Sequence, residues 1–217
     1  MTDLPARLFL VVPAGLEPER AAECITAACT AGDVACILVR LSEAAAEGEG
    51  EAGPRPPRPT AADEALARAV TESGQPLDAA VVVEDSVDLC RRVGADGVHI
   101  TRGPREAAAA RRLLGRGMIV GGEVRGKRHE AMELGEADID YIAIDQRQEA
   151  GGENLLAWWA EMFVVPVVAI APARPADMPA LVARGAGFVR PPDEMWQDAD
   201  AAARVIEACM AALKEAA

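Results

Sequence analysis

The chain has 217 residues and a formal charge of −13, from 22 Lys and Arg against 35 Asp and Glu. This length suits one domain, residues 1–217, and a hydrophobic content of 51% is ample for a folded core. The net negative charge argues against nucleic acid or an anionic membrane surface as a partner, because both are themselves negatively charged. We therefore expect a globular protein that acts on small molecules or on other proteins.

The cysteines and the apolar runs indicate in which cellular compartment the protein resides. The five cysteines show neither a CxxC pair nor a metal-ligand spacing with histidine, which favours a reducing compartment. The first apolar stretch, residues 8–12, is too short for the apolar region of a signal peptide. No later run approaches the roughly 20 apolar residues of a membrane-spanning helix. We expect a soluble, unprocessed, cytoplasmic protein.

Short aliphatic runs alternate with Ala-rich stretches in which apolar residues recur at helical spacing. Eight runs are predicted as strands, at residues 8–12, 34–41, 79–83, 97–100, 118–120, 141–144, 164–170 and 187–189. Eight helices are predicted to follow them in turn, at residues 17–31, 61–73, 87–93, 105–114, 127–135, 153–162, 177–183 and 198–214. Strands without polar alternation suit a parallel sheet buried on both faces. Eight β–α units in a chain this short predict a closed, eight-stranded (β/α)8 TIM barrel.

One segment, residues 42–60, interrupts this pattern. It is rich in acidic residues, proline and glycine and has neither a helical nor a strand period. We predict a mobile loop, which would lie on the C-terminal face of the barrel because it follows the second strand. A lid over the site and a plain solvated spacer are both open, and the spacer is favoured.

Polar residues cluster at the predicted C-terminal ends of the strands, which open onto one face of such a barrel. Eight of them are basic: Arg40, Arg102, Arg125, Lys127, Arg128, Arg147, Arg174 and Arg190. In an acidic chain, this clustering suits a site for an anionic, phosphorylated small molecule. The alternative is a solvated rim in which acidic neighbours balance the cations.

Phosphate in TIM barrels usually binds backbone N–H groups in the loops after the last two strands. Here these loops contain Pro172, Pro191 and Pro192, and proline has no N–H to donate. We therefore expect the side chains of Arg174 and Arg190 to supply phosphate contacts instead.

Glu84 and Asp85 follow the third predicted strand. One or two carboxylates, completed by substrate phosphates and water, commonly hold Mg²⁺. This pair is the predicted magnesium site. The alternative is that Asp85 caps the helix that begins near Val87.

Two histidines and two tryptophans also stand out. His99 lies inside the fourth predicted strand, where it is a base, a ligand or a packed structural residue. The structural role is favoured, because no other His or Cys lies near it in the sequence. His129 is predicted to be exposed at a helix start, and Trp158 and Trp159 to pack a helix on the barrel, with one of them open to a subunit contact.

Several segments carry a resemblance to a known family. They are LFLVV at 8–12, Arg40, VEDSVDL at 83–89, ADGVHI at 95–100, IVG at 119–121, DYI at 140–142 and VVAI at 167–170. In this order they resemble the thiamine phosphate synthase family, which includes the thiazole tautomerase branch, TenI. The similarity covers nearly the whole chain, and the DGVH strand and the DSVDL helix start are its most specific pieces.

The resemblance implies a TIM barrel of thiamine biosynthesis that couples a hydroxymethylpyrimidine pyrophosphate to a thiazole phosphate. Pyrophosphate leaves with the help of Mg²⁺, so positive groups that absorb the developing charge would supply most of the catalysis. By resemblance, Arg40 contacts the pyrophosphate as the catalytic residue, and Asp85, with Glu84, binds Mg²⁺. The remaining phosphate contacts fall to three arginines: Arg102, Arg174 and Arg190.

The chain departs from the family pattern at several polar positions. Each departure replaces a contact to phosphate, metal or substrate: Leu38 for Gln, Ser42 for Lys, Glu84 for Asn, Pro104 for Asp, Glu123 for Ser, Arg125 for the tautomerase histidine, and Ala171 and Pro172 for a Gly-Gly pair. Three functions follow as hypotheses: a transferase of this family, a non-catalytic binder of an anionic small molecule such as a TenI-like or regulatory paralogue, and a regulatory barrel without a ligand. Barrels of this kind often form homodimers, so a homodimer is also considered.

Overall fold

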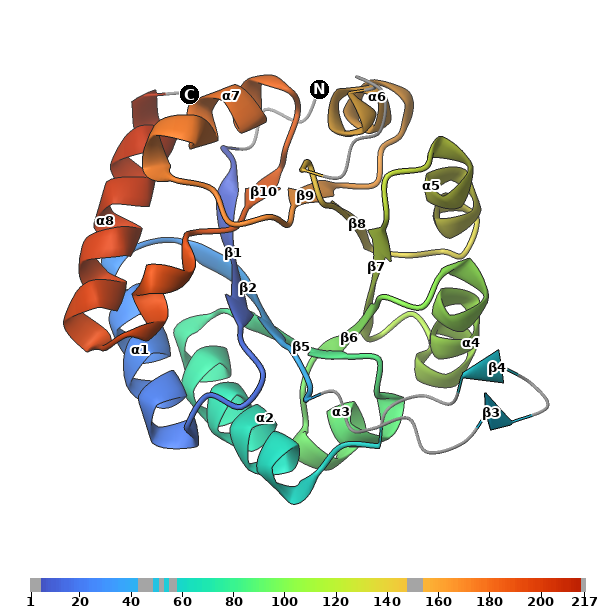
Figure 1. Ribbon diagram of the computed structural model, residues 1–217, viewed down its shortest axis with the longest axis horizontal. Coiled ribbons are helices and arrows are strands. Elements are labelled where there is room, and N and C mark those ends of the chain that lie inside the picture. Colours follow the sequence, from blue (N-terminus) through green and yellow to red (C-terminus); the bar gives the residue numbers. More distant parts are fainter. Residues whose placement is uncertain (1–4, 43–48, 51–52, 55–57, 148–153, 216–217) are drawn as a thin grey trace.

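The computed structural model describes residues 5–42, 49–50, 53–54, 58–147 and 154–215. Eight parallel strands form its centre: β1 (Arg7–Val12), β2 (Val34–Val39), β5 (Ala80–Glu84), β6 (Gly97–Ile100), β7 (Ile119–Val124), β8 (Tyr141–Ile144), β9 (Val167–Ala169) and β10 (Phe188–Val189). They close into a barrel in the order β1-β10-β9-β8-β7-β6-β5-β2 (Figure 1). The predicted TIM barrel is confirmed.

Eight α-helices surround the strands (Figure 1): α1 (Pro18–Ala31), α2 (Ala61–Gly74), α3 (Val87–Val93), α4 (Pro104–Leu114), α5 (Arg128–Gly135), α6 (Leu155–Met162), α7 (Met178–Ala183) and α8 (Ala199–Glu215). Local signals set their ends. Thr60 and Asp63 form a capping box at the start of α2, and Gly94, with φ 72°, ends α3 in the left-handed conformation that glycine adopts without steric penalty. Within the described residues, no helix combines the length and apolar character needed to cross a membrane.

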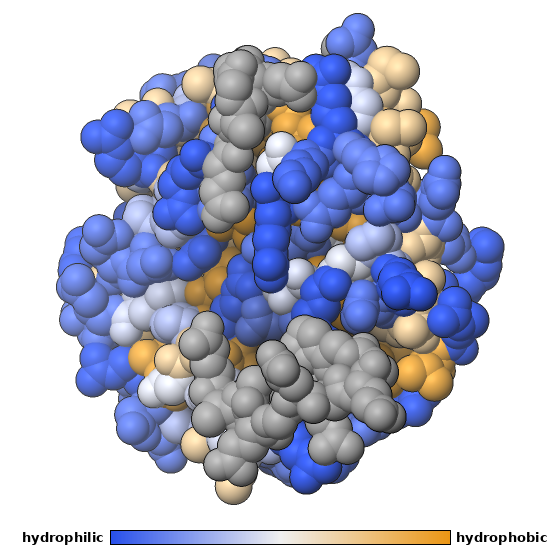
Figure 2. Space-filling view, turned by 45° about the vertical axis from the view of Figure 1, so that its right-hand side comes forward, coloured by the Kyte–Doolittle hydropathy of each residue, from blue (hydrophilic) through white to orange (hydrophobic). Residues whose placement is uncertain are grey.

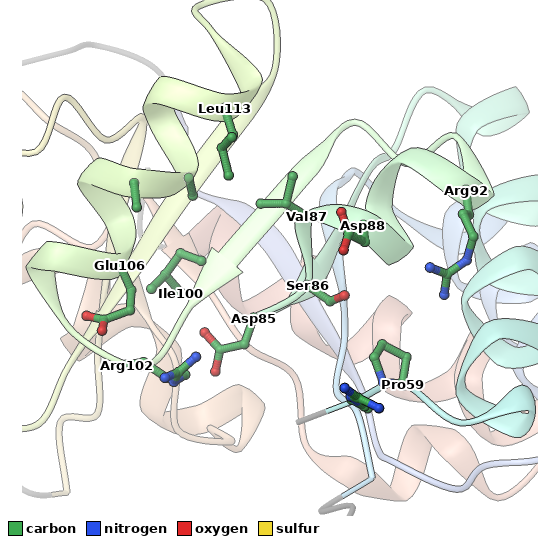
Figure 3. Close-up of a pocket in the computed structure, with 13 residues that line it drawn as sticks. Pro59, Asp85, Ser86, Val87, Asp88, Arg92, Ile100, Arg102, Glu106 and Leu113 are labelled. Atoms are coloured by element: carbon green, nitrogen blue, oxygen red, sulfur yellow. The ribbon is translucent and has the colours of Figure 1, made fainter. Parts of the chain in front are cut away.

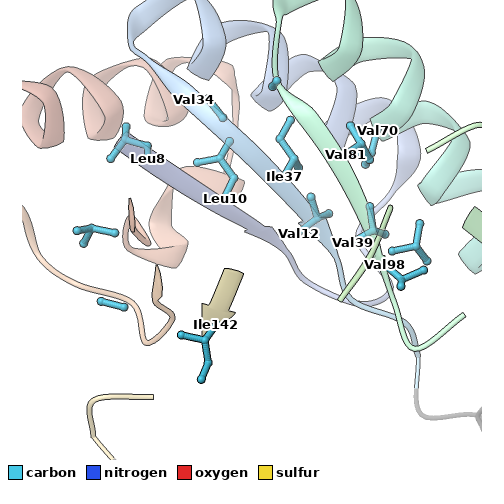
Figure 4. Close-up of a cluster of buried hydrophobic side chains, with 14 of the residues drawn as sticks. Leu8, Leu10, Val12, Val34, Ile37, Val39, Val70, Val81, Val98 and Ile142 are labelled. Carbon is cyan, nitrogen blue, oxygen red and sulfur yellow. The ribbon is translucent and has the colours of Figure 1, made fainter. Parts of the chain in front are cut away.

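Alternation along the strands separates two hydrophobic layers. Leu8, Leu10 and Val12 of β1 face outward and pack with residues of the other strands and of the helices (Figure 4). Phe9 and Val11, between them, face the barrel interior and join a separate inner cluster. Successive side chains of a strand point to opposite faces, so each strand supplies both layers. Side chains at inward positions near the strand C-termini therefore enter the mouth of the barrel.

Three predicted strands have bounds that differ from the structure by more than one residue. β2 ends at Val39, before the predicted residue 41. The strand predicted at residues 118–120 is longer, because β7 runs on through Gly121 to Val124. A glycine is required at position 121, since an added Cβ would lie 2.0 Å from Cζ of Tyr141. The ninth strand of the structure is also shorter than the predicted run, because β9 begins only at Val167.

The segment at residues 42–60 contains a feature that its sequence did not indicate. β3 (Glu49–Gly50) pairs antiparallel with β4 (Gly53–Pro54), whereas no strand was predicted here. Pairs of two residues are too short to produce a detectable period-two pattern. Residues 43–48, 51–52 and 55–57 lie outside the described residues, so the mobility of this loop stays a prediction.

Candidate functional site

Three charged residues enter the mouth of the barrel from the ends of three strands. Glu84 ends β5 and Glu123 lies near the end of β7, while Arg40 directly follows β2. Arg40 and Glu84 lie two positions after Leu38 and Val82 of the inner cluster, and Glu123 lies two positions after Gly121, which pairs with Tyr141 of the same cluster. The side chains therefore converge although they are far apart in the chain.

Arg40 lies between the two carboxylates. One of its terminal nitrogens donates to Oε1 of Glu84, and the other donates to Oε2 of Glu123 at 2.7 Å. The side chains of Arg40, Glu84 and Glu123 are only 24%, 15% and 19% exposed. The other oxygen of Glu84 accepts the backbone N–H of Leu41 at 2.9 Å. We call Arg40, Glu84 and Glu123 the mouth ion cluster.

A buried hydrogen-bonded chain supports this cluster from inside the barrel. His99, fully buried, has its Nε2 3.1 Å from Oε2 of Glu123 and its Nδ1 2.8 Å from the hydroxyl of Tyr141. An ionised carboxylate only accepts, so Nε2 donates to Glu123, and in the neutral imidazole Nδ1 then accepts from the hydroxyl of Tyr141. The predicted packed and hydrogen-bonded role of His99 is confirmed, and its partner Tyr141 lies 42 residues away.

These contacts change the acidity of Glu123. Burial by itself raises the pKa of the carboxyl group, but the bond from His99 and the pairing with Arg40 outweigh burial and lower the pKa to about 2. Burial lowers the pKa of Arg40, and the two carboxylates raise it by more. The cluster thus holds one positive and two negative charges near neutral pH, a formal sum of −1.

Asp85 turns away from this cluster toward β6. Its Oδ1 accepts the backbone N–H of Thr101 at 2.9 Å, and its Oδ2 accepts the hydroxyl of the same residue at 2.5 Å. The alternative role as helix cap is wrong, because Ser86 caps α3 by accepting from the N–H of Leu89. Asp85 has φ 46°, a left-handed conformation that is uncommon for a residue other than glycine and clusters at functional sites.

The predicted magnesium pair does not converge on one point. Glu84 contacts Arg40 and Leu41 on the β2 side, whereas Asp85 contacts Thr101 on the β6 side. Among the described residues, no group of three or more His, Cys, Asp or Glu side chains is arranged to hold a metal ion. Glu84 and Asp85, as arranged, do not fit a shared Mg²⁺ site, so magnesium binding stays a prediction.

Arg190 follows β10 and is the predicted phosphate-binding residue that the structure places in the mouth. Its side chain is 15% exposed, with Nη2 2.6 Å from Oδ1 of Asp193. Its Nε is buried without a hydrogen-bond partner among the described residues. Burial and the positive charges of Arg40 and Arg147 lower the pKa of Arg190, and Asp193 offsets only part of this effect. A buried N–H without an acceptor has a hydrogen bond to offer to a ligand.

Two other predicted arginines occupy the rim. Arg174 is 79% exposed, and its Nε lies 2.8 Å from Oδ2 of Asp177. Arg147 has a similar arrangement, with Nη2 2.8 Å from Oδ2 of Asp145. Of the eight basic residues predicted from sequence, Arg40, Arg147, Arg174 and Arg190 thus pair with carboxylates, as the solvated-rim alternative anticipated.

Arg102 lines a groove rather than the centre of the mouth. The groove, of about 640 Å³, runs between α3 and α4 and includes Asp85, Asp88, Ile100 and Glu106 (Figure 3). Figure 3 shows Asp85 between Arg102 and Ser86. The groove is lined by three acidic residues, Asp85, Asp88 and Glu106, and by three basic residues, Arg58, Arg92 and Arg102, so its formal charges sum to zero. The face shown in Figure 2 is likewise mixed, with mainly hydrophilic side chains and smaller hydrophobic patches among them.

The chain of Tyr141, His99 and Glu123 was the part of the site that the sequence analysis missed. Glu123 was noted only as a departure from the family pattern, and Tyr141 only as part of the DYI segment at residues 140–142. The usable signal was alternation within each predicted strand, which places His99 and Tyr141 on inward positions. The two tryptophans match their predicted roles in part: Trp159 is fully buried, and Trp158 packs on Phe163 and contacts Arg128.

Comparisons with known proteins agree with the fold and its sequence pattern. The family model described as "Thiamine monophosphate synthase" matches residues 8–190. The chain is 36% identical over 208 residues to the thiamine-phosphate synthase of Rhodospirillum centenum, covering 90% of this chain and 91% of that one. It is 29% identical to the thiamine-phosphate synthase of Hyphomonas neptunium, over 93% of this chain and 91% of the relative.

Among solved structures, the thiamine phosphate pyrophosphorylase of Pyrococcus furiosus superimposes with a TM-score of 0.73. The alignment covers 97% of this chain and 96% of that structure, at 20% sequence identity, which supports the shared fold. The family match, by contrast, spans the strands that carry Arg40, Glu84, Glu123 and Arg190. The chain therefore belongs to the thiamine monophosphate synthase family.

Proposed function

We propose that the protein couples a hydroxymethylpyrimidine pyrophosphate to a thiazole phosphate in thiamine biosynthesis. In this reaction the bond from the pyrimidine methylene carbon to a pyrophosphate oxygen breaks, and its electron pair leaves with pyrophosphate. The thiazole nitrogen then forms the new C–N bond. A cationic group that contacts the leaving oxygens in the mouth would stabilise the transition state more than the ground state.

The observation that carries this proposal is that Nε of Arg190 is buried without a hydrogen-bond partner among the described residues. Family membership supplies the reaction class, and Arg190 supplies a buried N–H without a partner at the mouth end of β10. An anionic oxygen would complete this hydrogen bond and would also reduce the repulsion between Arg190 and Arg40. We assign Arg190 to a substrate phosphate, Arg40 to the pyrophosphate, and a supporting role at the rim to Arg174 and Arg102.

The proposal is tested by measuring thiamine phosphate formation from the two substrates with Mg²⁺. We expect turnover by the wild-type protein, and a loss of 10²-fold or more, the size expected for an oxyanion contact, in Arg190→Ala. Arg116→Ala is the matched control, because Arg116 is 87% exposed and pairs with Asp138 on the opposite end of the barrel. Turnover that is absent in folded wild-type protein, or equal in both variants, would contradict the proposal.

Asp85→Ala belongs in the same assay. The family resemblance assigns the metal role to Asp85, whose two carboxylate oxygens accept hydrogen bonds from Thr101 in this structure. We expect turnover to disappear in this variant. Unchanged turnover would remove Asp85, and with it the predicted magnesium role, from the proposed site.

A second candidate function is non-catalytic binding of an anionic small molecule. The mouth ion cluster favours it, because both carboxylates already occupy the guanidinium that would otherwise contact pyrophosphate. If turnover is absent, this hypothesis expects each substrate alone to bind, with an affinity that falls as salt is raised. A cytoplasmic location and a homodimer remain part of the proposal for either function.

A further inference from the structure

The mouth ion cluster places a cation where the proposed reaction needs one, yet the cation is already neutralised. Arg40 donates from both terminal nitrogens to carboxylates, to Glu84 on one side and to Glu123 on the other. All three side chains are at least three-quarters buried, so water screens these pairs only weakly. An anion that approaches Arg40 meets a formal charge of −1 rather than +1.

Each carboxylate is also anchored on the side away from Arg40. Glu84 accepts the N–H of Leu41 at 2.9 Å, and Glu123 accepts from His99 at 3.1 Å, which is itself held by Tyr141. A carboxylate held by a second partner is not free to swing aside at no cost. An incoming anion therefore has to displace an anchored group or share Arg40 with it.

We propose that Glu84 and Glu123 are specificity-determining residues that exclude simple anions from Arg40. They take the place of a ligand anion on the guanidinium, so inorganic phosphate or pyrophosphate binds weakly at this point. A productive ligand must then add interactions of its own, such as an N–H or O–H substituent that donates to the released carboxylate. This inference rests on the proposed function only in its assumption that Arg40 faces the ligand.

Titration calorimetry with inorganic pyrophosphate at fixed ionic strength, without metal or organic substrate, tests the proposal. Glu84→Gln keeps an acceptor for the N–H of Leu41 and removes one negative charge. We expect about a tenfold gain in pyrophosphate affinity for this variant and for Glu123→Gln. In either background Arg40→Ala should abolish the gain, since the gain requires the freed guanidinium.

Glu64→Gln is the matched control. Glu64 also contacts two arginines, Arg68 at 3.1 Å and Arg92 at 3.0 Å, but it lies on the exposed surface of α2. We expect a change of less than about twofold, because exposed ion pairs are screened by solvent and salt. A comparable gain in this control would show a general charge effect and would overturn the assignment.

Unchanged or weaker pyrophosphate binding in both Glu84→Gln and Glu123→Gln would also overturn it. Near-ultraviolet circular dichroism establishes whether each variant is folded. If Glu123→Gln does not fold, Glu84→Gln alone tests the proposal. Since the titration contains neither the pyrimidine nor the thiazole substrate, its result is independent of turnover. The two proposals can therefore fail separately.

Discussion

The two ends of the barrel each bury an arginine, and the two arginines are satisfied in different ways. At the end formed by strand N-termini, Arg111 of α4 donates to the backbone carbonyls of Gly115, Met118 and Asp138 and to the carboxylate of Asp140. At the mouth, the hydrogen bonds of the Arg40 guanidinium within the described residues go to side-chain carboxylates. Backbone acceptors cannot leave without unfolding a loop, whereas side-chain acceptors can be displaced by a ligand.

This difference matches a general property of TIM barrels. Residues at the N-terminal end of the strands serve stability, and residues at the C-terminal end build the site. Arg111 is accordingly a structural arginine that joins the loops before β7 and β8. Arg40 is a residue whose interactions can change, and each of the following predictions would sharpen or break this distinction.

The largest effect is expected from Arg111→Ala. Its removal takes a donor from three backbone carbonyls, at a side chain only 10% exposed, while the half-exposed carboxylate of Asp140 keeps the N–H of Val120. At about 1 kcal/mol or more for each lost hydrogen bond, we expect a loss of about 3–5 kcal/mol of unfolding free energy, measured by urea denaturation. Arg116→Ala, on the same end but exposed, should change stability by less than about 0.5 kcal/mol. Equal effects would break the comparison.

The mouth ion cluster should make the unfolding free energy depend on pH in the acidic range. The pKa of Glu123 is lowered from 4.5 to about 2, so its stabilisation is complete above pH 4.5 and is lost as the pH falls toward 2. The shift corresponds to about 3 kcal/mol, which denaturation at several pH values measures. Glu123→Gln should flatten this part of the profile, whereas Glu133→Gln, 48% exposed on α5, should leave it as in the wild type. A wild-type slope in Glu123→Gln would be inconsistent with the lowered pKa.

A smaller loss is expected when the inner wall of the barrel is overpacked. In Gly121→Ala the new Cβ would lie 2.0 Å from Cζ of Tyr141 and would push that ring away from His99. We expect a loss of about 2 kcal/mol by thermal or urea denaturation. Gly117→Ala is the control, since nothing lies within 4 Å of its added Cβ. Equal stability of the two variants would show that the wall adapts without strain.

The smallest effect is expected from Tyr141→Phe. The variant removes the hydroxyl that lies 2.8 Å from Nδ1 of His99 and leaves that nitrogen without a donor, at a cost of about 1 kcal/mol. The bond to Glu123 should still keep the proton on Nε2, which nitrogen chemical shifts of the labelled imidazole report. A proton found on Nδ1 would contradict the tautomer that we assign.

Much of the fold followed from sequence because its determinants are local. Runs such as residues 141–144 and 97–100 were predicted with the bounds that β8 and β6 have. Helix starts were also largely correct, because capping residues and Ala-rich spacing act within one or two turns. The end of β7 was missed because glycine is locally unfavourable in strands, whereas at Gly121 the absent side chain leaves space for the distant ring of Tyr141.

The position of the candidate site was predictable from the sequence, but the exposure and the ion pairing of its side chains were not. Strand ends identified the mouth, and Arg190, which follows β10, is only 15% exposed there. Arg174 was predicted to bind phosphate beside it, yet it is exposed and paired with Asp177, because its loop turns outward into the short 3-10 helix Pro175–Asp177. A loop direction of this kind depends on packing between neighbouring β–α units, which composition does not encode.

The sequence by itself determined the order of β–α units, the closed barrel and the family, because hydrophobic periodicity and short motifs are read within a few residues. The tertiary structure alone decided which charges meet. Arg40 pairs with carboxylates 44 and 83 residues away, and no local pattern relates these positions. Barrel closure brings inward positions of different strands to one height, and at that height the low dielectric makes pairing of opposite charges the most favourable arrangement.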